Sequence, residues 1–150
     1  MNFDPKVYSV LTKSGWHQSR ELDERVIIEQ ITAEGYPVFE KVISFMKQFG
    51  GLFINFDNLQ NGIKNDTIDL DFEKATHIEV PEKIKRNYVP RVKKDLCLIG
   101  TAYRDYLILL MSSDGFVYGA YENYLCFINK TGEGALESII LNKNFVEITD

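Results

Sequence analysis

The sequence has no long hydrophobic run and little to identify it as a secreted or membrane protein. No window approaches the ~18 consecutive apolar residues that a bilayer-spanning helix requires. Residues 1–5, Met-Asn-Phe-Asp-Pro, have neither the basic stretch nor the apolar core of a secretory signal. We therefore expect a cytoplasmic protein that does not contact a membrane.

Cysteine and histidine are scarce, with two residues of each. Cys97 and Cys126 both lie in apolar runs and form no C-x-x-C motif, which predicts buried, reduced thiols. A reactive cysteine would need a basic, partly exposed setting. His17 and His77 have no second histidine or cysteine at a metal-ligand spacing, so we expect polar surface residues and no metal site.

The common catalytic and phosphate-binding motifs are also missing. The sequence has no G-x-S-x-G elbow, no G-x-G-x-x-G and no P-loop, and residues 132–134 lack the lysine and hydroxyl that phosphate binding would use. Asp69 and Asp71 could in principle hold Ca²⁺ or act as an acid–base pair. A hydrolase pair, however, normally comes from separate elements and has one desolvated carboxyl. We expect no enzymatic activity and no cofactor.

Positive charge is not in excess, which argues against a dedicated nucleic-acid binder. The formal net charge is −5 and the pI is about 5.1. Residues 57–82 hold seven acids against two lysines, and residues 105–150 repeat that balance, whereas residues 83–94 hold six basic side chains and no acid. The acidic blocks fit either a functional surface or a solvated face. Residues 83–88 could contact phosphates, or could form a solvated helix that pairs with the neighbouring acids.

What remains is the composition of an ordinary folded domain, 45% hydrophobic and 13% aromatic over 150 residues. This length fits one domain, residues 1–150, with a proper core. Asp4 and Pro5 are typical of a helix start, and Trp16 follows the first helix as an apolar anchor.

The hydrophobic period then changes from 3.6 to 2 residues along the chain. We expect helices over residues 5–14, 24–34, 37–49 and 132–141, and a short basic helix that Pro81 opens and Pro90 breaks. We expect strands over residues 52–56, 68–72, 96–103, 106–111, 116–121 and 124–128, and a loop over residues 58–67. Asp69 and Asp71 would point outward from the second strand, and the continuous apolar run 107–111 predicts a central strand buried on both faces. The order of elements predicts an α+β fold, a single domain in which N-terminal helices and a C-terminal helix cover an antiparallel sheet.

Tyrosines gather around the last predicted hairpin, where Tyr118, Tyr121 and Tyr124 lie close to Glu122. Tyrosine is favoured at interfaces because it adds a large contact area at low entropy cost. If alternate residues face outward, this hairpin presents an aromatic and acidic surface. The alternative, that these tyrosines belong to the core, is equally compatible with the sequence.

Several short motifs then occur in a familiar order. They are Gly15-Trp16 with Arg20, Gly35-Tyr36-Pro37, Phe49-Gly50-Gly51-Leu52, residues 71–75, Leu98-Ile99-Gly100, residues 109–119 and Ala135-Leu136. In this order and spacing the chain resembles the SUKH superfamily, and specifically its third branch of bacterial immunity proteins. It departs from the family pattern at Leu98, where the family usually has proline.

The resemblance implies an immunity protein, an antitoxin that binds the C-terminal domain of a polymorphic toxin used in bacterial competition. That domain is very often a nuclease, and the toxin in a Gram-positive producer would be of the LXG type. The family shares no catalytic residues, so none is assigned. A nuclease presents a basic groove, which an acidic inhibitor can reach quickly and block. We therefore expect the toxin to contact eight residues: Asp66, Asp69, Asp71, Glu73, Tyr118, Tyr121, Glu122 and Tyr124.

Two other functions remain open at this point. A regulatory scaffold is the first, because other branches of the superfamily occur in cell-wall and signalling regulators, and a toxin gene directly upstream would argue against it. An enzyme or a small-ligand protein is the second, and it would need a deep pocket with convergent polar groups.

Overall fold

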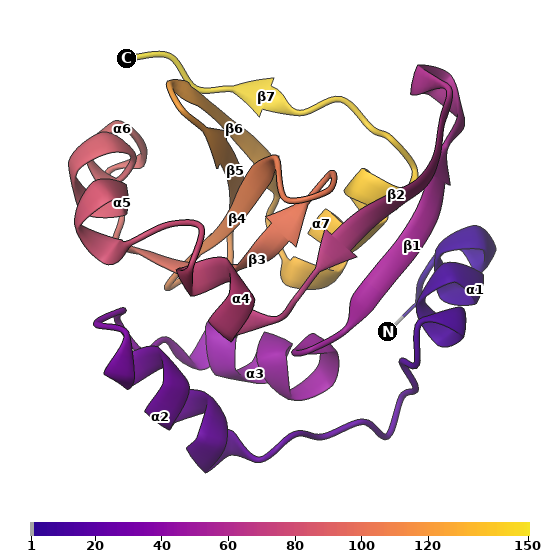
Figure 1. The fold of residues 1–150 in the computed structure, drawn as a ribbon, viewed down its shortest axis with the longest axis horizontal. Coiled ribbons are helices and arrows are strands. Elements are labelled where there is room, and N and C mark those ends of the chain that lie inside the picture. The colour runs from indigo at the N-terminus through magenta and orange to yellow at the C-terminus, as the bar shows by residue number, and fades with distance from the viewer. Residues whose placement is uncertain (1) are drawn as a thin grey trace.

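The computed structural model describes residues 2–150, apart from the side chain of Asn61. Residues 2–50 contain three helices and no strand, and all the strands follow, with further helices between them (Figure 1). The helices are α1 (Pro5–Lys13), α2 (Glu24–Ala33), α3 (Glu40–Phe49), the 3-10 turn η1 (Leu59–Asn61), α4 (Phe72–Thr76), α5 (Pro81–Asn87), α6 (Val89–Val92) and α7 (Gly132–Ile140). The strands are β1 (Phe53–Asn58), β2 (Ile63–Asp69), β3 (Leu96–Ala102), β4 (Leu107–Ser112), β5 (Val117–Tyr121), β6 (Tyr124–Asn129) and β7 (Val146–Glu147).

The seven strands form one sheet in chain order, and each neighbouring pair is antiparallel. The sheet curls around α7, so that this helix contacts both β1 and β6, which lie far apart in strand order (Figure 1). The predicted α+β fold with an antiparallel sheet and covering helices is confirmed.

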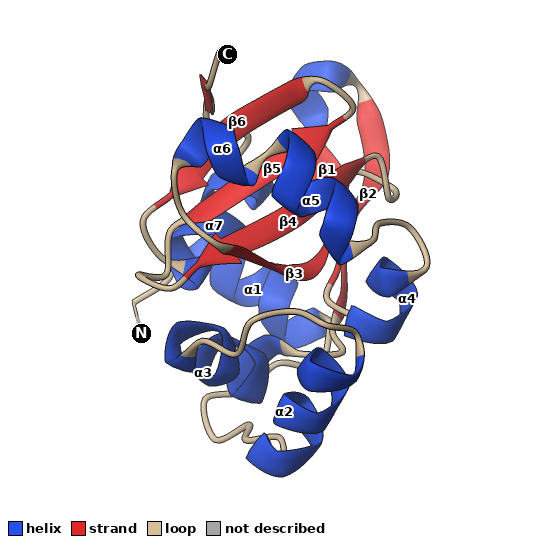
Figure 2. Cartoon of the chain, turned by 90° about the vertical axis from the view of Figure 1, so that its left-hand side faces the viewer, coloured by secondary structure: helices blue, strands red, loops and turns tan. Residues whose placement is uncertain are grey.

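Helices lie on both faces of the sheet. The helix α3 contacts β3 and β4, and α5 contacts β3. Figure 2 shows α5 and α6 over the near face of the sheet, with α7 behind it. Every residue of β3 and β4 is buried, as the apolar run at 107–111 predicts. The layers meet closely at Gly132, where an added Cβ would lie 2.2 Å from the Phe45 ring carbon Cδ1 on α3.

The helix starts follow from local capping. The carboxylate of Asp4 accepts the Lys6 amide at 2.9 Å, and that of Asp23 accepts the Arg25 amide at the same distance. Such side-chain oxygens satisfy amides that have no partner within the first helical turn. Pro90 breaks the basic helix as expected, since α5 ends at Asn87 and α6 begins at Val89.

Four element predictions are wrong. The third helix begins at Glu40 rather than at Pro37, and Val38 is 42% exposed. The second half of the expected loop 58–67, residues 63–67, belongs to β2, because antiparallel pairing with β1 satisfies its backbone. The expected strand 68–72 ends at Asp69, and α4 begins at Phe72. The short strand β7, which pairs with β6, was not expected.

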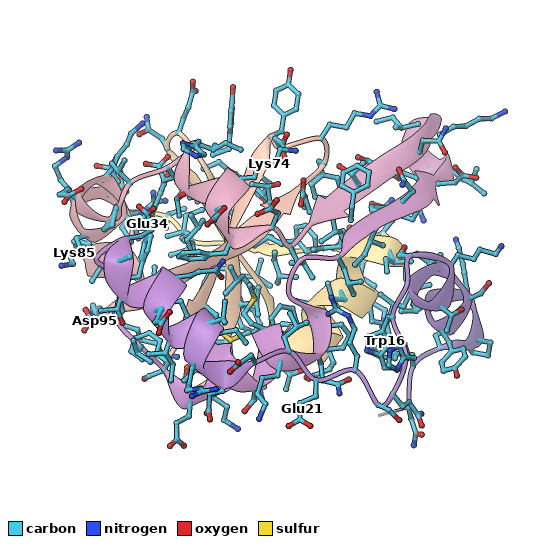
Figure 3. The ribbon with its side chains drawn as sticks, turned by 60° about the horizontal axis from the view of Figure 1, so that its bottom comes forward. Trp16, Glu21, Glu34, Lys74, Lys85 and Asp95 are labelled. Carbon is cyan, nitrogen blue, oxygen red and sulfur yellow. The ribbon has the colours of Figure 1, made fainter. Side chains whose placement is uncertain are left out.

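Both cysteines are buried and unpaired, as predicted. Trp16 is 2% exposed and lies between α1 and α3 (Figure 3). None of the helices over residues 2–150 is both long enough and apolar enough to cross a bilayer.

Candidate functional site

Two of the five expected acidic contact residues are buried. Asp66 is 2% exposed, and its carboxylate accepts the Thr67 amide at 3.0 Å. Asp69 is 6% exposed; it accepts the Asp71 amide at 3.1 Å and pairs with the Lys74 ammonium at 2.8 Å. The prediction that Asp69 points outward from a strand is therefore wrong. Its carboxylate supports the chain where β2 ends and α4 begins.

Asp71 and Glu73 are both exposed, but α4 carries them rather than a strand. The Asp71 carboxylate caps α4 by accepting the Lys74 amide at 3.1 Å. Asp69 and Asp71 consequently share no strand face, and the idea of a paired-carboxylate site on that face is also wrong. Hydrogen bonds from Lys74 to Asp69 and Asp105 raise the pKa of the lysine, which holds the positive charge beside the buried acid.

The tyrosines divide between the two alternatives that the sequence leaves open. Tyr118 is 5% exposed and packs against the Phe127 ring at 5.8 Å, so it belongs to the core. Tyr121 and Tyr124 are 46% and 39% exposed and face each other across the last hairpin, with Glu122 exposed in the turn between them. The sequence pattern thus located an aromatic and acidic surface at the tip of the hairpin and wrongly included one core residue.

Tyr121 and Glu122 line a cavity of about 360 Å³, which we call the tyrosine groove. Its wall includes Tyr106, which is 68% exposed and meets the Tyr121 ring edge to face at 5.9 Å. The complete lining is Ile78, Glu79, Lys83, Tyr88, Arg104, Asp105, Tyr106, Ile108, Ala120, Tyr121 and Glu122. The groove therefore combines exposed aromatic area with charged groups of both signs.

The floor of the tyrosine groove is held by a buried hydroxyl. Tyr88 is 2% exposed, and its hydroxyl donates to the Glu122 carbonyl at 2.8 Å, which ties the end of α5 to the β5–β6 turn. Burial raises the pKa of Tyr88, so this donor keeps its proton at neutral pH. One oxygen of Glu79, Oε1, is buried without a hydrogen-bond partner among the described residues.

Strained backbone surrounds the same groove. Tyr103, Arg104 and Asp105 have φ values of 57°, 56° and 69°, and Glu122 has a φ of 53°. Left-handed conformations of residues other than glycine are unfavourable and occur where the surrounding structure enforces them. Here the Tyr103 amide donates to the Thr67 carbonyl at 2.7 Å. The left-handed β3–β4 turn places Tyr106 at the groove, where its amide donates to the Tyr103 carbonyl at 3.2 Å.

Chemistry of the usual catalytic kinds has little support. No group of three or more His, Cys, Asp or Glu side chains within residues 2–150 could hold a metal ion. His17 and His77 are both exposed. Burial raises the pKa of Cys97 to about 12, so its thiol stays protonated at neutral pH. The arrangement is suited to recognising another molecule by contact.

Comparison with known proteins identifies the class of molecule recognised. Residues 3–142 match the family model of the SUKH-3 immunity protein family. The chain belongs to this family. Membership makes it an immunity protein, a class whose members bind a cognate toxin. No curated protein and no solved structure matched the chain.

Sequence reasoning missed Ile78, Glu79 and Tyr106 as parts of the groove. Tyr106 was expected to begin a strand, but it follows the left-handed β3–β4 turn. No turn motif indicates this geometry, because tyrosine, arginine and aspartate rarely adopt it together. Ile78 and Glu79 follow α4, a helix that the sequence does not predict and whose first residue, Phe72, falls in an expected strand.

Proposed function

We propose that this SUKH-3 family protein acts in the cytoplasm as an antitoxin against an LXG-type toxin. In this proposal it binds the C-terminal nuclease domain of the toxin, a DNase or an RNase, and blocks it without catalysis. The resemblance of the chain implies this class of toxin, and the physical properties of the exposed surface support it. The protein itself makes no direct contact with nucleic acid.

The tyrosine groove is the observation that carries the proposal. Binding energy at protein interfaces is concentrated in a few aromatic and arginine side chains that fill partly desolvated pockets. Tyr106 and Tyr121 offer such aromatic area, and Ile78, 40% exposed, adds an apolar contact beside them.

The charge of the chain supports a basic partner. A net charge of −5 attracts a nuclease whose substrate groove is positive, which raises the association rate and makes it sensitive to salt. Of the eight residues expected to contact the toxin, we retain the exposed ones: Asp71, Glu73, Tyr121, Glu122 and Tyr124. Asp66, Asp69 and Tyr118 would support that surface from within.

The test is calorimetric titration of the protein into the inactivated C-terminal domain of the toxin encoded directly upstream. We expect one-to-one binding that weakens as salt rises. Tyr121→Ala should raise Kd by about tenfold or more, as loss of an interface hot spot does. Tyr8→Ala is a matched control, since Tyr8 is 45% exposed and lies on α1, outside the groove.

Two outcomes would contradict the proposal. If the wild-type protein does not bind the toxin, the antitoxin function against that toxin fails, and a regulatory scaffold becomes the better reading. If Tyr121→Ala and Tyr8→Ala bind equally well, the toxin is bound elsewhere than in the tyrosine groove.

A further inference from the structure

A second groove runs between α2 and α4, and we call it the α2–α4 groove. It consists of two adjoining hollows of about 290 Å³ and 210 Å³, which share Gln30, Phe72 and Glu73. The floor is apolar and includes Ile27, Met46 and Leu70. It shares no lining residue with the tyrosine groove: Phe72 and Glu73 at the start of α4 line the α2–α4 groove, whereas Ile78 and Glu79, which follow α4, line the tyrosine groove.

The α2 wall of this groove leaves apolar surface uncovered. Leu22 and Val26 are 37% and 49% exposed, although both line the groove beside buried Ile27. Leu22 lies just before the N-cap Asp23 and Val26 lies in the first turn of α2, and both side chains extend the apolar floor toward solvent.

The rim of the α2–α4 groove is acidic. Five acids line it, and no lysine or arginine does: Asp23, Glu29, Glu34, Asp71 and Glu73. Glu29, Glu34 and Glu73 form no ion pair with any described residue. The nearby Lys74 ammonium forms ion pairs with Asp69 and Asp105 at 2.8 and 3.2 Å. Glu29, Glu34 and Glu73 therefore keep their negative field for an incoming partner, whereas Asp23 pairs with Arg25 at 3.7 Å.

We propose that the α2–α4 groove receives an amphipathic helix that carries lysine or arginine residues on both sides of an apolar stripe. Helix-in-groove binding uses apolar side chains one turn apart, which fit an apolar floor of this kind. The helix α2 (Glu24–Ala33), which forms this wall, spans about 15 Å at the rise of a helix, enough for roughly three turns of a partner helix. An acidic rim attracts a basic helix and repels nucleic acid and anionic lipid.

This inference rests on the proposed function in one respect: it assumes that the partner helix belongs to the toxin. One partner that covers α4 would reach both grooves, so the tyrosine groove and the α2–α4 groove would form two parts of a single contact surface. The aromatic part then supplies most of the affinity, and the acidic part guides the approach.

The first experiment measures association and dissociation rates of the inactivated toxin domain with three variants, at low and high salt. Glu29→Lys should slow association several-fold at low salt and reduce its dependence on salt. Val26→Gln should speed dissociation and leave association unchanged, because it removes an apolar contact and no charge. Asp95→Lys is the control: it makes the same charge change at an exposed acid outside both grooves, and its association rate should change less than twofold.

A second experiment uses no toxin, so that failure of the two proposals can be told apart. The probe is a fluorescent amphipathic peptide of about 18 leucine and lysine residues, and its leucine–glutamate counterpart serves as control. We expect the wild-type protein to bind only the lysine peptide, and Glu29→Lys to weaken that binding more than Asp95→Lys does.

If the wild-type protein binds the toxin but Glu29→Lys behaves as Asp95→Lys does and Val26→Gln as wild type, the groove proposal is overturned and the proposed function stands. If the toxin is not bound, the proposed function fails and the peptide decides the groove. If Glu29→Lys and Asp95→Lys then bind the peptide equally well, the proposal for the α2–α4 groove is overturned as well.

Discussion

Replacing Trp16 with alanine would remove the side chain that packs between α1 and α3. The indole stacks on the Phe49 ring at 5.9 Å, with 10° between the planes, and receives the edges of Phe3 and Tyr8 at 5.5 and 5.7 Å. Its N–H donates to the Gln48 amide oxygen at 3.2 Å. The same Gln48 amide donates to the Arg20 carbonyl at 2.7 Å, so the substitution affects the whole segment between α1 and α2.

The expected loss follows from the burial of the indole. Replacing a buried tryptophan with alanine typically costs about 3–5 kcal/mol, and little collapse is possible among three rings. We take about 4 kcal/mol, of which the hydrogen bond to Gln48 contributes about 1 kcal/mol. A domain of this length loses about 2–4 °C of melting temperature per kcal/mol, so Trp16→Ala should melt about 8–16 °C below the wild type.

The assay is thermal and urea unfolding followed by far-ultraviolet circular dichroism, since Trp16 is the only tryptophan and its fluorescence is lost. Trp16→Phe is the control: it keeps an aromatic stack on Phe49 and removes the N–H donor, so it should be destabilised by less than Trp16→Ala. A free energy of unfolding for Trp16→Ala within about 1 kcal/mol of the wild type would refute the packing role.

Three further substitutions or treatments test other parts of the structure. Cys97 and Cys126 should not react with a thiol reagent at pH 8 until the protein is denatured, when both should react, as counting released chromophore will show. Gly100→Ala should lower the melting temperature, because its Cβ would lie 2.4 Å from the Asp69 carbonyl oxygen. Hydrogen bonds from Lys94 and Ser112 lower the pKa of Asp114. The ionised carboxylate therefore stabilises the fold above the ordinary carboxyl pKa, and this stabilisation is lost as pH falls. The free energy of unfolding of Asp114→Asn should therefore fall less than that of the wild type as pH drops below about 4. The difference should be under about 1 kcal/mol, because the Lys94–Asp114 ion pair is partly exposed.

The elements that could be predicted from the sequence are those with local signals. Asp4 and Pro5 mark the start of α1 through capping, and the apolar run at 107–111 marks a strand buried on both faces. The strand β2 has no such signal, since residues 63–65 are all exposed and two of the three are polar. It is a strand because β1 pairs with it, and this non-local fact is absent from any short window.

The site shows the same limit at single residues. Tyr118 and Tyr121 are three apart on one strand, so the alternation of strand residues places them on opposite faces. Residues 117–120 are buried on both faces, however, so Tyr121 is exposed because it ends the strand, and the sequence does not show where along β5 the covering layers stop. Tyr106 reaches the tyrosine groove only through the left-handed turn before it, and the enforcing contacts from Thr67 come from a strand that the sequence did not reveal.

The region around Asp69 shows why this matters for testing the function. The alternating sequence Asp69-Leu70-Asp71-Phe72 is typical of a strand with outward acids, yet the same letters also contain a helix cap, with Asp71 before Phe72 and Glu73. Reversing the charge at Asp69 would leave Lys74 facing a second cation in a buried position, and breaking such a pair destabilises a fold strongly. Weaker binding of the toxin by such a variant would then reflect loss of folded protein and not loss of a contact with the toxin. Exposed acids without ion pairs, such as Glu29 and Glu73, separate the two effects, because their reversal changes the field around the partner while the core stays intact.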